Sequence, residues 1–68
     1  MENNRWGFRI RAFRKLKRIK QAEFAKKTGI PLSILGKIER RERHVNEEEL
    51  QIIANNLEIN VKELKGEA

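Results

Sequence analysis

The sequence predicts a small all-α domain built from five short helices. Apolar residues recur at intervals of three and four, no alternating β-branched run appears, and only four glycines and one proline interrupt the pattern. Sixty-eight residues make a single domain, residues 1–68, with a core over about residues 5–65 and frayed ends. A core this small should provide only on the order of a few kcal/mol of stability.

A first helix is expected over about residues 5–18, with Asn4 as its N-cap. A stripe of side chains at i, i+4, i+7 and i+11 suits the core: Trp6, Ile10, Phe13 and Lys17. Phe8 and Leu16 lie off this stripe. We expect them to pack on another helix, and the alternative is a surface for a partner.

Residues 21–28 and 32–39 predict two further helices joined by a tight turn. Gly29 can adopt the positive φ that ends the first of them, and Pro31 suits the start of the second. Such a pair can bury one face and offer the outer face of its second helix to a groove, so we interpret it as a helix-turn-helix. The side chains that share a face within each helix are Phe24 with Thr28 and Leu35 with Ile38.

Two capping signals predict the remaining helices. Asn46 with Glu49 forms a capping box that opens a helix over about residues 47–56, after a polar connector over 40–45. Its expected buried stripe comprises Leu50, Ile53, Ala54 and Leu57. Asn60 with Glu63 repeats the signal ahead of a short helix over residues 61–65.

Basic residues are concentrated in the first two thirds of the chain, whose overall net charge is +6. Residues 1–44 hold fourteen Lys or Arg against four Glu, a net charge of +10, whereas residues 45–68 hold two Lys against six Glu, a net charge of −4. A basic region that contains a helical pair suits a polyanion, because each neutralised phosphate releases counterions. The composition therefore favours polyanion binding over an ordinary solvated surface.

Several function classes find no support in the sequence. The chain has no cysteine and one histidine, His44, so no disulfide framework, metal site or cofactor is expected. No apolar run approaches the roughly 20 residues of a membrane span, and no signal peptide is evident, which indicates a cytoplasmic protein without a membrane partner. Ser33 is the only serine, and no catalytic constellation accompanies it, so we expect no enzyme activity.

From Trp6 to Leu64 the chain resembles the lambda-repressor-like, Cro-type (XRE family) helix-turn-helix regulators. The resemblance lies in the segments IRAFRKLKRIKQAEFAKKTGI, ILGKIER and ELQIIANNLEINVKEL, with Gln21, Ala25, Gly29 and Glu39 at the spacing of the family. It implies a five-helix lambda-repressor-like fold with the helix-turn-helix at helices two and three. It also implies sequence-specific binding of double-stranded DNA by a transcriptional regulator, a repressor that acts by occupying a promoter.

The resemblance also assigns roles to individual residues. Gln21 would meet a phosphate or the base edge beside it, and the helix over 32–39 would lie in the major groove. The residues expected to face bases are Leu32, Ser33, Gly36 and Lys37, and those expected near the DNA backbone are Arg40, Arg41 and Arg43. Arg14 and Glu39 match an ion pair of the family that aims the reading helix without touching DNA.

Three positions depart from the family pattern. Lys20 stands where a Ser or Thr cap is usual, and Arg41 replaces the glycine that usually closes the third helix. Gly36 places a residue without a side chain in the reading helix. Base readout should therefore be thin, and DNA shape should carry more of the specificity.

One module offers few base contacts, so a homodimer on half-sites about one helical turn apart is expected. Ile59, Val61 and Leu64 could form its interface or close the core of the domain. The alternative function is a protein-interaction module of the same fold that binds a partner regulator or toxin, with apolar surface from Phe8, Leu16, Leu32 and the fifth helix. RNA binding ranks last, because it usually needs exposed aromatic residues and we expect Trp6 and Phe13 to be buried.

Overall fold

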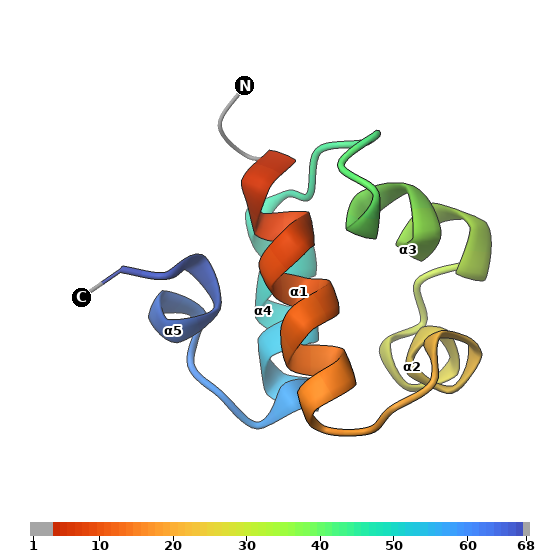
Figure 1. Ribbon diagram of the computed structural model, residues 1–68, viewed down its shortest axis with the longest axis horizontal. Helices are drawn as coiled ribbons and strands as arrows, with labels where there is room; N and C mark the ends of the chain where they lie inside the picture. The colour runs from red at the N-terminus through yellow and green to blue at the C-terminus, as the bar shows by residue number, and fades with distance from the viewer. Residues whose placement is uncertain (1–3, 68) are drawn as a thin grey trace.

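Five helices follow one another along the chain, and the predicted all-α fold is confirmed (Figure 1). The structure, a computed structural model, describes the backbone of residues 4–67 and the side chains of residues 6–67, and no strand occurs in this part of the chain. α1 lies beside α4 in the centre, α2 and α3 lie on one side of them, and α5 lies on the other. The helices are α1 (Asn4–Leu16), α2 (Gln21–Thr28), α3 (Leu32–Glu39), α4 (Glu47–Leu57) and α5 (Val61–Lys65).

α1 differs from its predicted bounds at both ends. It begins at Asn4, which is therefore the first helical residue and not the expected N-cap. It ends at Leu16 because Arg18 has a φ of 61°, in the left-handed region, and the Ile19 N–H then donates to the carbonyl of Arg14 at 3.1 Å. Lys17 lies beyond the helix and is exposed, so the stripe on α1 lacks the last of its four predicted members.

The core draws on all five helices and on two of the connections between them. Val45 is buried, although it falls in the connector that we expected to be polar. Leu64 is fully buried, so of its two expected roles it closes the core and does not form a dimer contact. Ile59 and Val61 are half-buried against the core. The largest fully buried side chains are Phe24, Ile10, Leu35, Ile38, Leu50, Ile53, Leu57, Leu64 and Val45.

α1 packs against α3 at a glycine, and the outer face of α1 is not covered by another helix. A Cβ on Gly7 would clash with the carbonyl oxygen of Ile38, so the two helices approach too closely for any other residue. Phe8 and Leu16 are 62% and 74% exposed. The prediction that they pack on another helix is therefore wrong.

The predicted caps of α4 and α5 are present. The Glu49 N–H donates to Asn46 Oδ1 at 2.7 Å, and the Asn46 N–H donates to Glu49 Oε1 at 3.0 Å, which completes the capping box. The Glu63 N–H donates to Asn60 Oδ1 at 2.8 Å at the start of α5. Within the described residues, no helix has the length and apolar character needed to cross a membrane.

Candidate nucleic-acid interface

The turn between α2 and α3 is fixed by backbone geometry and one hydroxyl. Gly29 has a φ of 79°, and its N–H donates to the carbonyl of Ala25 at 2.9 Å. Thr28 Oγ1 donates to the carbonyl of Phe24 at 3.0 Å and accepts from the Ile30 N–H at 3.2 Å. The buried Thr28 thus satisfies the polar backbone on both sides of the turn, which holds α3 at a fixed angle to α2.

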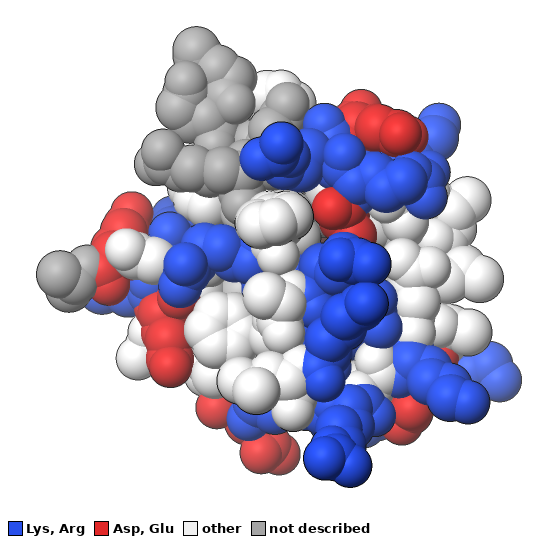
Figure 2. Space-filling view, in the orientation of Figure 1, with Lys and Arg blue, Asp and Glu red and all other residues white. Residues whose placement is uncertain are grey.

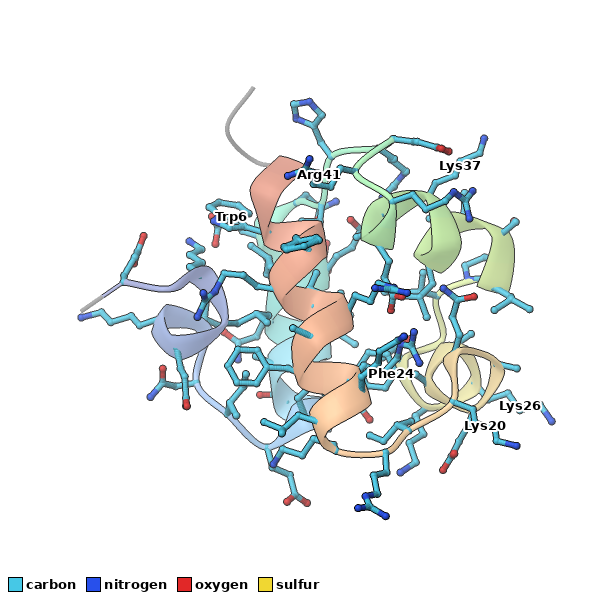
Figure 3. The ribbon with its side chains drawn as sticks, in the orientation of Figure 1. Trp6, Lys20, Phe24, Lys26, Lys37 and Arg41 are labelled. Atoms are coloured by element: carbon cyan, nitrogen blue, oxygen red, sulfur yellow. The ribbon has the colours of Figure 1, made fainter. Side chains whose placement is uncertain are left out.

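α3 has a buried face and an exposed face. Leu35, Ile38 and Glu39 point into the domain, whereas Leu32, Ser33 and Lys37 are exposed. Figure 3 shows Lys37 projecting away from the body of the molecule. Three of the four residues predicted to face bases are therefore accessible to a groove.

Gly36, the fourth of these residues, is buried. A Cβ at this position would lie 3.0 Å from Arg40 Nη1 and 3.9 Å from Gln21 Nε2. Gly36 therefore lies beneath two long polar side chains and does not face outward as predicted. Because these side chains are flexible, either could move aside and let a ligand approach the backbone of α3.

A buried ion pair joins α1 to α3. Arg14 Nε donates to Glu39 Oε2 at 2.8 Å and Arg14 Nη2 donates to Glu39 Oε1 at 2.9 Å, and the two side chains are only 9% and 1% exposed. Arg14 Nη1 also donates to the carbonyl of Ile19 at 2.7 Å, and Gln21 Nε2 donates to Glu39 Oε1 at 3.1 Å. The network thus ties α3 to α1, to the loop after α1 and to the first residue of α2.

Two of the three arginines that follow α3 pair with carboxylates, and we did not predict these pairs from the sequence. Arg40 pairs with Glu42, with Nε to Oε2 at 3.2 Å, and both side chains are more than half exposed. Arg43 pairs with Glu49 through two hydrogen bonds, at 3.2 and 3.1 Å. The guanidinium of Arg41 lies 5.5 Å from the centre of the Phe8 ring.

Glu49 serves two partners at once. Burial alone would raise the pKa of its carboxyl group, but hydrogen bonds from the Arg43 guanidinium and the Asn46 N–H, together with the charge of Arg43, hold that pKa below its ordinary value of 4.5. Glu49 is therefore firmly ionised at neutral pH. A phosphate that binds Arg43 would have to compete with this carboxylate.

α3 ends in the way that a glycine would allow, although an arginine is present. Arg41 has a φ of 63°, and the Glu42 N–H donates to the carbonyl of Lys37 at 2.8 Å. The departure from the family pattern thus retains the usual geometry at the cost of backbone strain. At the start of α2, the other departure, Lys20 makes no side-chain capping bond.

Lys26 is a candidate contact that we did not predict from the sequence. It is exposed on α2 and borders the same surface hollow as Leu32, on the side of the molecule from which Lys37 also projects (Figure 3). The sequence could have indicated Lys26, because it follows Ala22 by one helical turn and so lies on the face of α2 next to the turn. Among the described residues, no three His, Asp or Glu side chains are grouped so that they could hold a metal ion.

Comparison with known proteins agrees with this geometry. A family model described as Helix-turn-helix matches residues 10–64, which includes α2, α3 and the buried Glu39. The uncharacterized HTH-type transcriptional regulator YazB of Bacillus subtilis (strain 168) is 52% identical over 64 residues, which cover 94% of this chain and 93% of the relative. No solved structure gives a significant match.

Proposed function

Because the chain belongs to the lambda-repressor-like, Cro-type family of helix-turn-helix transcriptional regulators, we propose that it binds double-stranded DNA with α3 in the major groove. It would regulate transcription as a repressor that occupies a promoter. The observation that supports this proposal is the two-faced α3, which exposes Leu32, Ser33 and Lys37 while its other face is anchored in the core.

Direct base readout rests on three side chains of α3. Lys37 can donate to guanine O6 or N7, Ser33 can pair with several bases or a phosphate, and the half-exposed Leu32 can pack on a thymine methyl group. Gly36 adds no side chain to this set. With so few base contacts, the shape and deformability of the operator should contribute much of the specificity.

Contacts to the DNA backbone would come from the start of α2 and from the segment after α3. Gln21 stands at the N-terminus of α2, where the helix dipole favours a phosphate. Arg40, Arg41 and Arg43 follow the C-terminus of α3 and would fix the register of the protein on the duplex. Arg40 and Arg43 would exchange their carboxylate partners for phosphate, so each should contribute less affinity than an arginine without such a partner.

A homodimer on DNA is part of the proposal, since one module offers few base contacts. Two copies related by two-fold symmetry would occupy half-sites about one helical turn apart. Ile59 and Val61 retain partial exposure and remain candidates for the contact between the two copies, whereas Leu64 does not.

The test is a selection of binding sites from a randomised DNA pool, followed by binding of the winning sequences at two salt concentrations. We expect a palindromic motif and a steep loss of affinity as salt rises. Lys37→Ala, selected in parallel, should lose preference at one base pair of each half-site. If no motif is enriched and the residual binding is weak, the proposal of a sequence-specific regulator is wrong.

A protein-interaction role is the second candidate function. The exposed Phe8 and Leu16 favour it, because a small domain gains nothing in stability from large apolar side chains that face water. These residues lie on α1 and not on the exposed face of α3, and the two proposed surfaces adjoin where the Arg41 guanidinium lies over the Phe8 ring. Binding through an apolar surface should also be far less sensitive to salt than binding to DNA.

A further inference from the structure

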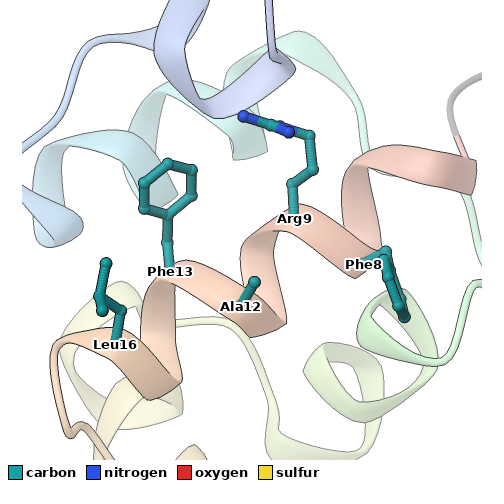
Figure 4. A pocket seen from close by; sticks show the side chains of 5 residues that line it. All are labelled: Phe8, Arg9, Ala12, Phe13 and Leu16. Carbon is teal, nitrogen blue, oxygen red and sulfur yellow. The ribbon is translucent and has the colours of Figure 1, made fainter.

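The outer face of α1 carries an apolar surface that no helix of the domain covers. Phe8 and Leu16 are 62% and 74% exposed, Ala12 is exposed between them, and Phe13 is half-buried at the edge. Together with Arg9 these residues line an open hollow of about 460 Å³ (Figure 4). We call the surface of Phe8, Ala12, Phe13 and Leu16 the α1 patch.

The geometry points to a docking site for an acidic amphipathic helix of another protein on the α1 patch. Phe8, Ala12 and Leu16 are spaced by four residues, so they form one row along α1. A row with a hollow beside it accepts a ridge of side chains from a second helix. The contact is small, so we expect a dissociation constant in the micromolar range.

The charges around the α1 patch indicate that the partner segment is acidic. α1 contains no acidic residue. Arg11 and Lys15 are exposed beside the apolar row, and within residues 6–67 neither forms an ion pair. In Figure 2 Lys and Arg side chains border the uncharged centre of this face on the right and at the upper left. A partner with Asp or Glu on both sides of an apolar stripe would match this arrangement.

Arg9 borders the other side of the α1 patch and is held in place by α5. Its Nε donates to the carbonyl of Leu64 at 2.9 Å, its Nη2 donates to the carbonyl of Glu63 at 3.1 Å, and its guanidinium lies 5.7 Å from the centre of the Phe13 ring. Figure 4 shows Arg9 extended from α1 toward α5. A positive charge fixed in this way loses little conformational freedom when a carboxylate binds beside it.

A second copy of the chain does not fit the α1 patch. In a two-fold dimer the same surface faces itself, so Arg11 and Lys15 of one copy would oppose those of the other. In the acidic first turn of α4, Glu47 already pairs with Lys65 and Glu49 with Arg43, so these carboxylates are not free to neutralise α1 of another copy.

A membrane surface also fits poorly. Insertion between lipid headgroups requires a continuous apolar helix face, but Trp6, Ile10 and Phe13 of α1 pack in or against the core, and Phe8 and Leu16 are its only large exposed apolar side chains among residues 6–67. The α1 patch is instead hollowed beside Phe13, which suits a side chain of a protein partner. The observations therefore favour a helical protein segment.

The experiment selects partners from a display library of helical peptides with randomised surface positions, with the full chain as bait. The library is first depleted on the bare support, and the double variant Phe8→Gln/Leu16→Gln, whose substitutions are exposed and keep good helix formers, is reserved as the test of the site. We expect enriched peptides with one apolar stripe flanked by Asp or Glu. Circular dichroism checks that every variant is folded.

Affinities of the best peptide then test the geometry. We expect binding at least tenfold weaker to Phe8→Gln/Leu16→Gln, and about tenfold weaker to Arg11→Glu/Lys15→Glu. Ile52→Gln is the matched control, because Ile52 is an exposed apolar residue on α4 and its replacement should leave the affinity unchanged. The inference rests on the second candidate function, protein interaction, and because DNA is absent throughout, the result does not depend on the proposed DNA binding.

Four outcomes would overturn the inference. One is enrichment of neutral or basic peptides, and another is equal binding to the double variant, which would place the peptide on a different surface. A third is self-association of the chain that Leu16→Gln abolishes, which would make a second copy the occupant. The fourth is the absence of enriched peptides, and binding to phosphatidylglycerol vesicles that Leu16→Gln abolishes would then identify a membrane surface as the occupant.

Discussion

Breaking the ion pair between Arg14 and Glu39 should lower the free energy of unfolding strongly, whereas replacing both residues by apolar ones should change it little. Glu39→Leu removes the carboxylate and leaves the Arg14 guanidinium, whose side chain is 9% exposed, with only the carbonyl of Ile19 as a partner within the network. A buried charge stranded in this way typically costs about 3–5 kcal/mol. Because Arg14 keeps its bond to Ile19 and a little exposure, we expect a cost near the lower end, about 3 kcal/mol.

The double variant Arg14→Met/Glu39→Leu should recover most of this loss. Replacing a buried pair by apolar side chains of similar volume is often neutral or stabilising, since neither charge then has to be desolvated. In a domain of this size, about 1 kcal/mol corresponds to roughly 4–8 °C in Tm, so Glu39→Leu alone should lower Tm by roughly 12–24 °C. Gln21 would lose its acceptor in both variants, which makes the comparison a matched one.

Urea denaturation measures both variants, with far-ultraviolet circular dichroism for the helices and the fluorescence of Trp6, the single tryptophan, for the packing of α1. The reasoning is refuted if Glu39→Leu costs less than about 1 kcal/mol, or if the double variant is no more stable than Glu39→Leu. If the pair also aims α3, the folded double variant should bind DNA with reduced sequence preference.

Three further predictions concern Lys37, Arg43 and Glu49. Lys37→Ala should weaken discrimination at one base pair by about 1–3 kcal/mol, as measured by titration against single-base variants of the selected site, whereas equal losses on all sequences would identify a phosphate contact. Arg43→Ala should weaken binding to all DNA sequences alike and reduce the salt slope. Glu49→Gln should strengthen DNA binding, because it removes a carboxylate that competes with phosphate for Arg43. In filter-binding assays, a gain of affinity for Arg43→Ala or a loss for Glu49→Gln would contradict the pairing. Because the pKa of Glu49 is lowered in the folded state, its ionised carboxylate stabilises the fold at pH values above the ordinary pKa of 4.5. This contribution is lost as pH falls through the folded-state pKa, so acidification should reduce the stability of Glu49→Gln less than that of the parent. Equal losses of stability would count against this prediction.

The helix bounds were predictable wherever a local signal marks them. α2, α3 and α5 have the expected ranges because Gly29, Pro31 and Asn60 mark their ends through backbone or capping chemistry that acts over a few residues. The end of α1 was not predictable in this way, since Arg18 adopts a left-handed conformation that its residue type does not favour. Gly7 was a signal that we did not use, although a glycine within a helical pattern often marks a close helix contact.

The candidate site was predictable as a set of positions but not as a set of contacts. The resemblance placed Arg14 and Glu39 as a pair, and the structure brings them together. Gly36 was expected to face outward, but the long side chains of Arg40 and Gln21 cover it, and helical spacing alone cannot show such cover. The burial of Val45 likewise depends on the path of the connector across the core.

The pairing of Arg43 with Glu49 shows why a charge count along the sequence overstates the affinity for DNA. The two residues belong to different charge regions of the sequence, one basic and one acidic, and the connector after α3 folds one onto the other. A phosphate bound at Arg43 would displace a carboxylate, so part of the electrostatic gain would be offset by freeing Glu49. The same holds for Arg40 and Glu42. The salt slope of DNA binding should therefore correspond to fewer phosphate contacts than the number of basic residues near α3.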